Sequence, residues 1–381
     1  MRHEHQRLFH AGPQLLLASI RESFWPLGGR TLARSITKSC VICTRYRGKT
    51  LQPIMGQLPP ERTNVTFPFY SCGTDFGGPF MISSRKGRGN RITKCYLCIF
   101  VCLLTKAVHL EVVSDLSTEA FILCLRRFVS RRGKPHVIYC DNGTNFVGAN
   151  NELGRIIRSS RKPVCDYAGS EGIIMKFIPA YSPNFGGIWE SGVKSSKYHL
   201  KRIAGNASLT FEELTTLFAQ IEAILNSRPL YPLSSDPNDL NPITPGHFLI
   251  GRPLMSVPSE VVEVARPNRY QLIEKLRQQF WERWKKEYLA ELQTRTRWRT
   301  DDLQIKVGQM VLLKDDHAPP LKWPLGRVTK LYPGPDNTAR VVDVTTQRGT
   351  FRRAVNKLVL LLDDTLEANS LPGAPGCSRN N

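Results

Sequence analysis

The hydrophobic pattern in the middle of the chain alternates between strand-like runs and a clear helical segment. Three apolar runs rich in branched and aromatic residues, followed later by the run VIYC before Asp141, predict buried β-strands. Between them, Phe121, Leu125 and Phe128 recur at helical spacing, and Gly133 is a typical helix stop. This alternation predicts an α/β domain. The first three predicted strands cover 67–76, 96–104 and 107–113, and the predicted helix covers about 118–130.

The C-terminal part of the chain predicts a helix followed by a small β-domain. Trp281, Trp284, Tyr288 and Leu292 recur at helical spacing, and charged residues occupy the other faces. An aromatic stripe of this kind is more typical of core packing than of base stacking. Short apolar runs separated by Pro, Gly and Asp residues then predict a compact antiparallel barrel. Its four predicted strands cover 309–314, 326–332, 340–345 and 350–353.

The N-terminal segment carries histidines and cysteines in a pattern typical of a structural metal site. His5 and His10 precede Cys40 and Cys43, which form a Cys-x2-Cys pair. Two imidazoles and two thiolates suit one tetrahedral Zn²⁺ ion, and His3 is an alternative to His5 as the first ligand. Because so small a unit lacks core area, a bound Zn²⁺ would stabilise its fold. The helices predicted there are one opening at Pro13, with Leu16, Leu17 and Ile20, and one over 31–39.

A second Cys-x2-Cys pair, Cys95 and Cys98, has a different explanation. The pair lies inside the apolar run KCYLCIFVCLL, which predicts a strand. Successive side chains of a strand alternate between its faces, so residues three apart point to opposite sides and cannot bind one ion together. Buried thiols in a core strand are therefore predicted.

Two proline-rich stretches, 51–68 and 229–267, lack helical or strand periodicity and indicate junctions between domains. We find no internal repeat. The domain boundaries that we predict are a zinc-binding module at 1–50, a linker at 51–61, a central α/β domain at 62–250, a linker at 251–267, a helix with a small barrel at 268–361 and a disordered tail at 362–381.

Length and composition agree with a protein of several domains. The chain has 381 residues, of which 41% are hydrophobic, enough to bury real cores and too many for a disordered protein. Its longest apolar run, 95–104, is shorter than the roughly 18–20 residues that span a bilayer, and no signal peptide is visible. A membrane-spanning protein is therefore not expected, and the predicted partners include no membrane.

Charge is the informative feature of the composition. The chain holds 53 Lys and Arg residues against 32 Asp and Glu residues, a net charge of +21, and the surplus is spread over every predicted domain. Such an excess predicts a polyanionic partner, with nucleic acid as the first candidate. The ten unevenly spaced cysteines do not indicate a secreted disulfide scaffold in so long a chain.

Three acidic residues of the central domain run against this positive trend. Asp141 directly follows a predicted strand, where open α/β sheets place ligand groups, and Asp75 interrupts a strand-like segment that disfavours a carboxylate. Glu190 begins a helical face that continues with a row of lysines. Carboxylates beside lysines suit metal-assisted chemistry on a phosphate backbone, and an ordinary solvated Glu/Lys face is the alternative for this helix. The lysines are Lys194, Lys197 and Lys201.

Around these acids the sequence resembles retroviral and retrotransposon integrases. Asp75 in GTDFGGPF, Asp141 in CDNGTNFVGA and Glu190 in NFGGIWESGVKS match the Asp, Asp, Glu triad of that superfamily. These motifs are most similar to those of the integrases of Bel/Pao-type LTR retrotransposons. In those elements the integrase region belongs to a larger polyprotein. Asn184 stands where family members usually have His. Further agreement is found in HAGPQLLLASIRESFWPLGGR, CVIC, LNSRPL, LNPITPGHFLIGRPL, WERWKKEYLAELQTRTRW, VGQMVLLKDD and WPLGRV.

The resemblance implies a fold and a mechanism. By it, the central domain is expected to be RNase H-like with a five-stranded mixed sheet, and the C-terminal barrel to be of Src-homology-like type. Asp75, Asp141 and Glu190 are expected to bind two Mg²⁺ or Mn²⁺ ions, with Asp75 shared between them. The reaction that the resemblance implies trims the 3′ ends of element DNA and joins them to host DNA. It is expected to take place in the nucleus, in homo-multimers that bridge two DNA ends.

The C-terminal domain is expected to contact the DNA backbone in a salt-sensitive and sequence-tolerant way. A function of a different class stays open, namely a catalytically inactive or domesticated polyprotein fragment that binds nucleic acid without cutting it. A host RNase H-like nuclease is disfavoured, because the zinc module and the barrel flank the same core. The residues predicted to contact DNA are Lys322, Arg327, Lys330, Arg352 and Arg353, together with the three lysines after Glu190.

Overall fold

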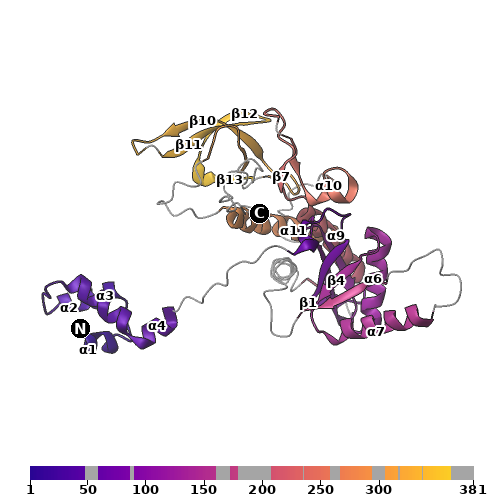
Figure 1. Ribbon diagram of the computed structural model, residues 1–381, viewed down its shortest axis with the longest axis horizontal. Coiled ribbons are helices and arrows are strands. Elements are labelled where there is room, and N and C mark those ends of the chain that lie inside the picture. Colours follow the sequence, from indigo (N-terminus) through magenta and orange to yellow (C-terminus); the bar gives the residue numbers. More distant parts are fainter. Residues whose placement is uncertain are drawn as a thin grey trace, which may run out of the picture. The chain divides into compact units, whose positions relative to one another are not determined.

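The computed structural model divides the chain into two compact units, Met1–Leu58 and Pro59–Asn381 (Figure 1). The predicted tail at 362–381 lies outside the described part of the chain. The residues that the structure describes are 1–47, 59–85, 90–159, 172–178, 207–234, 236–257, 267–293, 305–315, 318–336 and 338–361.

Among its described residues, the first unit is a bundle of short helices, drawn in indigo in Figure 1. They are α1 (Arg2–Arg7), α2 (Pro13–Arg21), α3 (Gly29–Ser39) and α4 (Val41–Arg47). Pro13 occupies the first turn of α2, where its missing N–H removes no helical hydrogen bond. The buried apolar cluster of the described residues consists of Leu16, Leu17, Ala33 and Ile36. Both predicted helices are confirmed, and the core between them is small.

The second unit is built on a mixed β-sheet. Its strands are β1 (Ser71–Ser83), β2 (Ile92–Cys102), β3 (Val108–Val113), β4 (Val137–Cys140), β5 (Ile174–Phe177) and β6 (Leu209–Thr210). They lie in the order β3-β2-β1-β4-β5, and β6 pairs with the far end of β1. The first three strands pair antiparallel, whereas β4 runs parallel to both β1 and β5. The predicted α/β organisation is therefore present.

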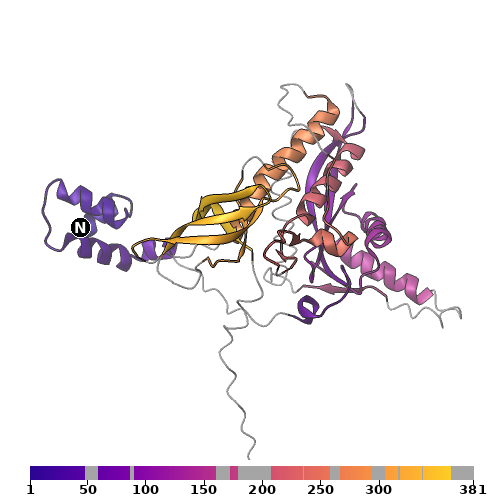
Figure 2. The same cartoon turned by 90° about the horizontal axis from the view of Figure 1, so that it is seen from above.

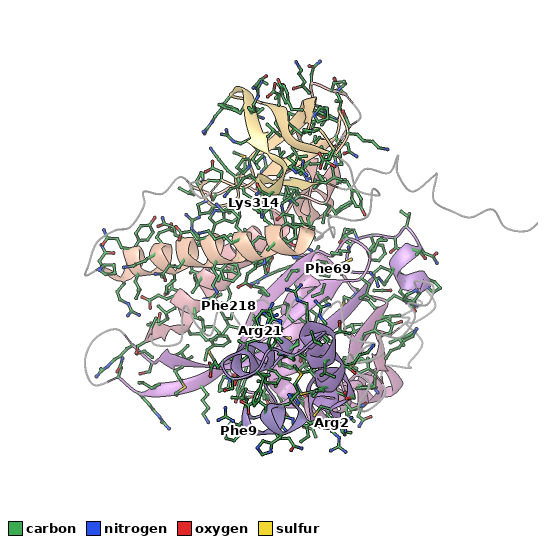
Figure 3. The ribbon with its side chains drawn as sticks, turned by 90° about the vertical axis from the view of Figure 1, so that its left-hand side faces the viewer. Arg2, Phe9, Arg21, Phe69, Phe218 and Lys314 are labelled. Carbon is green, nitrogen blue, oxygen red and sulfur yellow. The ribbon has the colours of Figure 1, made fainter. Side chains whose placement is uncertain are left out.

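Helices cover both faces of this sheet (Figure 2). The helices are α6 (Thr118–Arg132) and α7 (Thr144–Ser159) on one face, and α9 (Phe211–Asn226) and α11 (Arg269–Leu292) on the other. Two separate buried clusters fill the space between the sheet and these layers. Phe69 and Phe218, labelled in Figure 3, belong to the α6/α7 cluster and the α9/α11 cluster respectively.

Strand β2 confirms the prediction for the second Cys-x2-Cys pair. Cys95 belongs to the α9/α11 cluster and Cys98 to the α6/α7 cluster, and neither is exposed. Burial raises the pKa of the Cys95 thiol to about 11. The two thiols are therefore core side chains on opposite faces of one strand.

Helix α6 begins where the sequence predicts and ends two residues later. The Ser117 hydroxyl accepts a hydrogen bond of 3.2 Å from the backbone N–H of Ala120, which caps the N-terminus. Gly133 follows the last turn with φ of 88°, a backbone conformation that glycine adopts without strain. The predicted stripe of Phe121 and Phe128 is fully buried against the sheet.

The prediction that the proline-rich stretches 51–68 and 229–267 lack regular structure is wrong in part. Pro232 and Pro242 face each other in a two-residue antiparallel ladder, and Pro245 lies in the first turn of a helix. Each proline occupies a place where no N–H donor is required. A short helix likewise forms within the first stretch. The elements are α5 (Pro60–Thr63), β7 (Tyr231–Pro232), β8 (Pro242–Ile243) and α10 (Pro245–Ile250).

The second unit ends in a separate antiparallel sheet. Its strands are β9 (Met310–Leu313), β10 (Leu325–Pro333), β11 (Ala339–Thr346), β12 (Gly349–Ala354) and β13 (Leu358–Leu360), with the 3-10 turn η3 (Val355–Lys357) before the last. They lie in the order β12-β11-β10-β9-β13. The first four match predicted strands. The sequence does not predict β13, because three residues carry too little pattern.

Helix α11 packs into the core of the central sheet, as its aromatic stripe predicts. Trp281 is 1% exposed and Trp284 is 5% exposed, and both lie in the same buried cluster as Phe218. The Trp281 ring N–H donates a hydrogen bond of 2.8 Å to the carbonyl of Ala318, which lies between β9 and β10 of the C-terminal sheet. This helix has 24 residues, yet none of the described helices is long and apolar enough to cross a membrane.

Candidate functional site

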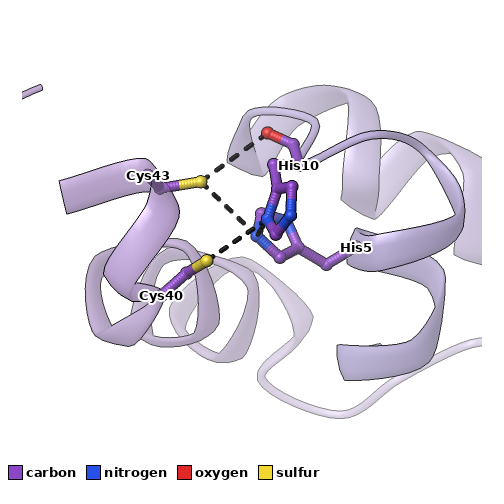
Figure 4. A group of neighbouring side chains, drawn as sticks. All are labelled: His5, His10, Cys40 and Cys43. Atoms are coloured by element: carbon purple, nitrogen blue, oxygen red, sulfur yellow. Dashed lines mark hydrogen bonds between the residues drawn. The ribbon is translucent and has the colours of Figure 1, made fainter. Parts of the chain in front are cut away.

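Four side chains of the first unit converge on one point (Figure 4). The ligand atoms of His5, His10, Cys40 and Cys43 all lie within 4.8 Å of one another. His5 Nε2 lies 3.2 Å from His10 Nδ1 and 3.5 Å from Cys43 Sγ. Cys40 Sγ lies 3.2 Å from His10 Nδ1. These spacings fit ligands placed about 2.0–2.3 Å from a tetrahedral ion, so the cluster could bind Zn²⁺.

The surroundings of the cluster favour the ligand forms that a metal requires. His5 Nδ1 lies 3.1 Å from the carbonyl of Ala11, which orients the ring and leaves Nε2 facing the cluster. A hydrogen bond from the backbone N–H of Cys43 lowers the pKa of the Cys40 thiol. His3, the alternative first ligand, is exposed and lies outside the cluster. The histidine pair and the cysteine pair therefore form one group of four ligands, and its first ligand is His5.

Strand register places two of the predicted acids side by side on the central sheet. Asp75 lies within β1, and Asp141 directly follows β4. The two strands pair in parallel, with Gly73 opposite Tyr139. Continuing this register by two residues brings Asp75 level with Asp141. Neighbouring strands lie about 4.8 Å apart, and aligned residues of a parallel pair project from the same face, so the carboxylates can share a ligand.

Local backbone contacts hold both acids in place. An Asp75 carboxylate oxygen accepts a hydrogen bond of 2.6 Å from the backbone N–H of Phe76. An Asp141 carboxylate oxygen accepts one of 3.0 Å from the backbone N–H of Gly143, which turns the chain directly after the strand. A Cβ at Gly143 would lie 3.0 Å from that same Asp141 oxygen and 2.7 Å from Asn145 Oδ1. The small residue in the sequence CDNG thus keeps the acid accessible at the strand end.

The remaining residues predicted for this site lie outside the described part of the chain. They are Glu190, Lys194, Lys197 and Lys201. The third acid and the row of lysines therefore stay predictions.

One group near the acids is not predicted from the sequence. Glu61 of α5, Tyr139 of β4 and Lys176 of β5 form a hydrogen-bonded triad. The residues are separated by 78 and 37 positions along the chain, and no spacing pattern connects them. The only sequence signal is the position of Tyr139, two residues before Asp141 on the same strand face.

Predicted DNA-contacting residues of the C-terminal sheet gather around two aromatic rings. Lys330 Nζ lies 5.2 Å from the centre of the Tyr332 ring, and the Arg352 guanidinium lies 4.2 Å from it. Arg352 also donates a hydrogen bond of 2.9 Å to Asp343, and this contact lowers the pKa of the Asp343 carboxyl. The Arg353 guanidinium lies 5.3 Å from the centre of the Phe351 ring. These exposed cations and rings could together face a nucleic-acid backbone.

Lys322 and Arg353 line a cavity of about 1070 Å³ between the C-terminal sheet and the β7–β8 hairpin. The cavity also includes Trp323 and Phe351 in its wall. Its lining therefore combines aromatic side chains with cations, and it includes two residues that the sequence places 31 positions apart.

Arg327 does not suit the predicted contact with DNA. It is 8% exposed, and its guanidinium donates hydrogen bonds of 2.9, 2.8 and 3.0 Å to the carbonyls of Gly308, Asp236 and Asp239. Arginine has five N–H donors in a rigid fork, so it can hold several carbonyls at once. Here it connects the C-terminal sheet to the segment between β7 and β8. The sequence shows its charge but not its burial.

A second charged cluster lies at β3, the terminal strand of the sheet, where side chains of α6 and α9 meet those of His109 and Glu111. The His109 ring lies 3.1 Å from Glu111 through Nε2 and 3.1 Å from Glu222 through Nδ1. Arg127 and Arg131 each contact Glu111 at 2.7 Å, and Arg132 pairs with Glu222. Burial alone would lower the pKa of His109, but hydrogen bonds to the two carboxylates raise it above its usual value. This basic end of α6 is therefore engaged in holding the fold.

Two of three comparisons with known proteins find similarity to this chain. Residues 268–361, which span α11 and the C-terminal sheet, match a family of unknown function (DUF5641). No curated protein matches the chain. Among solved structures, it is similar to the cryo-EM structure of simian T-cell lymphotropic virus intasome in complex with PP2A regulatory subunit B56 gamma. That similarity has a TM-score of 0.36 and 14% sequence identity, and it covers 95% of this chain and 99% of that chain.

Proposed function

We propose that the protein is a metal-dependent DNA integrase of the Bel/Pao retrotransposon type, whose central domain is RNase H-like. The observation that carries this proposal is the register of the central sheet, which brings Asp75 level with Asp141 on neighbouring parallel strands. The sequence motifs around these acids and Glu190 support the same function. The net charge of +21 supports a nucleic-acid substrate.

The donor atoms of the proposed catalytic site fit hard divalent cations. Asp75 and Asp141 offer carboxylate oxygens, the ligands that Mg²⁺ and Mn²⁺ prefer, and Glu190 is the third ligand that we propose. Two such ions, when bound, would polarise the reacting phosphodiester and stabilise the attacking and leaving oxygens. The role of the chain is to hold the ligands on a rigid strand and on the turn that follows its neighbour. Neither strand needs to move for the two acids to act together.

The proposed reaction is two successive in-line displacements at phosphorus. In the first, a water molecule loses a proton as its oxygen bonds to the phosphorus near the 3′ end of the element DNA, and the 3′ oxygen leaves and takes up a proton. In the second, that new 3′-hydroxyl loses its proton as it bonds to a phosphorus of target DNA, and the target's own 3′ oxygen leaves and takes up a proton. No covalent bond to the protein is required in either step.

For the first unit we propose a structural role for one Zn²⁺ ion held by His5, His10, Cys40 and Cys43. The nitrogen and sulfur donor set, the ligand spacing and the orienting contact from the Ala11 carbonyl all support zinc over a hard cation. All four positions of a tetrahedral site are filled by protein ligands, which is typical of structural rather than catalytic zinc. The bound ion would supply the stability that the small apolar core lacks.

For the C-terminal sheet we propose a Src-homology-like barrel that holds the DNA backbone. Lys330 and Arg352 around Tyr332, with Lys322 and Arg353 at the cavity, are the residues that support this role. We further propose that the protein acts as a homo-multimer on nuclear DNA, with modules at 1–50, 62–250 and 268–361 joined by linkers.

Strand transfer with a radiolabelled LTR-end duplex tests the proposal. The purified chain is incubated with Mg²⁺ or Mn²⁺ and target DNA, and joined products are counted for the wild type and for Asp141→Asn. The matched control is Asp115→Asn, an exposed acid in the turn before α6 whose contact with the backbone N–H of Ser117 an amide oxygen can keep.

The expected result is joined product from the wild type and from the control, and none from Asp141→Asn. Equal products from all three would contradict the assignment of the site. If the wild type binds the duplex but joins nothing under any metal, the chain is instead the inactive nucleic-acid-binding fragment.

A further inference from the structure

The triad of Glu61, Tyr139 and Lys176 is a compact polar group with one shared oxygen at its centre. The Tyr139 hydroxyl donates a hydrogen bond of 2.6 Å to Glu61 Oε1. Lys176 Nζ donates to the same Glu61 oxygen at 3.0 Å and to the Tyr139 hydroxyl oxygen at 3.1 Å. The ammonium also lies 5.3 Å from the centre of the Tyr139 ring. Three elements, α5, β4 and β5, are thus required to place one lysine.

The register of the sheet locates this triad beside the two acids. Tyr139 pairs with Gly73 on β1 and with Lys176 on β5. Two residues further along the same strands lie Asp75, on β1, and Asp141, directly after β4. Side chains two residues apart on a strand share a face, and the strand rises roughly 7 Å over that interval. The lysine therefore lies on the same face as the acids, one strand away from Asp141 and two strands away from Asp75.

The charge state of the triad is fixed by its own contacts. The hydrogen bond from Tyr139 and the contact with Lys176 lower the pKa of the Glu61 carboxyl to about 2. Hydrogen bonds to Tyr139 and, second, to Glu61 raise the pKa of Lys176 above its usual value. An ammonium has three N–H donors, and Lys176 directs two of them to described residues, Glu61 and Tyr139. The third N–H can donate a hydrogen bond to an oxygen of a bound molecule.

Fold stability alone explains this group poorly. The Lys176 side chain is 47% exposed and that of Glu61 is 23% exposed, so water screens the ion pair. Exposed pairs contribute little to folding, because ordering two long side chains opposes a weak attraction. The ammonium is nevertheless oriented by two partners and by an aromatic ring. This combination of access and preorganisation is what a binding residue requires.

We propose that Lys176 binds a backbone phosphate of the DNA strand, next to the phosphodiester that lies over Asp75 and Asp141. Glu61 and Tyr139 act as positioning residues that keep the ammonium over this face of the sheet. The inference rests on the proposed function, since it takes that function's substrate and adds a contact for it. A phosphate oxygen would accept the third N–H of Lys176 in a charge-assisted hydrogen bond.

The test measures the affinity of the full chain for a fluorescent LTR-end duplex over a series of salt concentrations. Ca²⁺ replaces Mg²⁺ so that binding is read without reaction. The variants are Lys176→Met, which removes the charge, and Lys176→Arg, which keeps it. The matched control is Lys94→Met, an exposed lysine on β2 that pairs with Met81, six residues beyond Asp75 on β1. Thermal melting of each variant checks that the fold is kept.

For Lys176→Met we expect a loss of about tenfold in affinity and a salt slope reduced by about one. Lys176→Arg is expected to recover most of the affinity, and Lys94→Met is expected to match the wild type. Glu61→Gln keeps the acceptor oxygen but removes the competing negative charge, so it should bind DNA as tightly as the wild type or tighter. A merely structural triad predicts the opposite, with Glu61→Gln and Lys176→Met weakened alike.

A neutral methylphosphonate moved along one strand then identifies the phosphate. At the position that Lys176 contacts, the duplex should bind wild type and Lys176→Met equally, because the charge on one side of the contact is already gone. At all other positions the difference between the two proteins should persist. If no position removes the difference, or if Lys176→Met binds like Lys94→Met, the proposal is overturned.

These readouts separate the lysine from the catalytic proposal. Affinity and salt slope require no reaction, so a wild type that binds but never joins DNA would contradict the proposed activity and leave the contact measurable. Conversely, full joining by Lys176→Met at wild-type KM would contradict the contact while leaving the integrase proposal intact.

Discussion

The two metal-directed sites of this chain differ in what holds them. The His/Cys cluster of the first unit draws its ligands from short helices that bury four apolar side chains among the described residues. The pair of acids in the second unit, Asp75 and Asp141, lies on a sheet that is packed on both faces by large buried clusters. In the first case the ion would hold the fold, and in the second the fold holds the ligands. The difference predicts which changes damage structure and which damage only chemistry.

Loss of the first cluster is expected to have the largest structural effect. His5→Ala should release the bound Zn²⁺ and unfold the first unit, because apparent zinc-binding energies of about 10–16 kcal/mol are folding energy in such modules. His3→Ala is the matched control, since His3 lies on the same helix outside the cluster. Zinc content by atomic emission and helical circular dichroism are measured together. Retained helicity in zinc-free protein would remove the contrast between the two sites.

Loss of one acid is expected to leave structure intact and stop the reaction. Asp75→Asn should lower the strand-transfer rate at least about 100-fold, because a metal's polarising effect contributes several kcal/mol to such a reaction. The melting temperature should not fall, since the change removes a charge that lies level with the Asp141 carboxylate. Rate and melting curve are measured on the same preparation. A variant that unfolds would show that the acid is structural.

Removal of core volume should affect the second unit alone. Trp281→Ala deletes a side chain that is 1% exposed and is expected to cost about 3–5 kcal/mol of the free energy of unfolding. Tyr270→Ala, at a 68% exposed position of the same helix, is the control and should cost little. Chemical denaturation followed by tryptophan fluorescence gives both values, while zinc content should stay unchanged. Coupled loss of zinc would contradict independent units.

A smaller, pH-dependent contribution to the stability of the second unit is expected from His109. Its pKa is raised in the folded state by Glu111 and Glu222, so its stabilising contribution is full below the unfolded pKa near 6.5 and is lost as pH rises through the folded value. The stability of the second unit should therefore decline on that alkaline side. His109→Gln, measured by denaturation over the same pH range, should flatten the decline. An unchanged profile in the variant would assign the effect to other groups.

Sequence periodicity is sufficient where local spacing decides the outcome. The stripe of Phe121 and Phe128 fixes one face of α6, and the three-residue spacing of Cys95 and Cys98 places them on opposite faces of β2. The His5 to Cys43 cluster is predicted for the same reason, because each ligand pair lies within one short turn. In these cases the local backbone conformation determines which side chains share a face or a turn.

Contacts between distant segments are where sequence reasoning fails. Nothing in the spacing of Glu61, Tyr139 and Lys176 indicates that they meet, since only the order of β4 and β5 in the sheet joins them. Arg327 carries the positive charge expected of a DNA contact, yet it is hydrogen-bonded to two carbonyls of the segment between β7 and β8. Burial is a property of the whole fold, so a charged residue cannot be assigned to solvent from its neighbours in sequence.

The central claim is that Asp141 binds a catalytic metal on a rigid sheet, and a metal switch tests it most directly. Asp141→Cys replaces an oxygen ligand by a thiolate, which Mg²⁺ binds poorly and Mn²⁺ accepts better. The measurement is the strand-transfer rate of this variant with each ion, relative to the wild type. The account predicts almost no product with Mg²⁺ and clear recovery with Mn²⁺. Equal rates with the two ions, at the wild-type level, would contradict it.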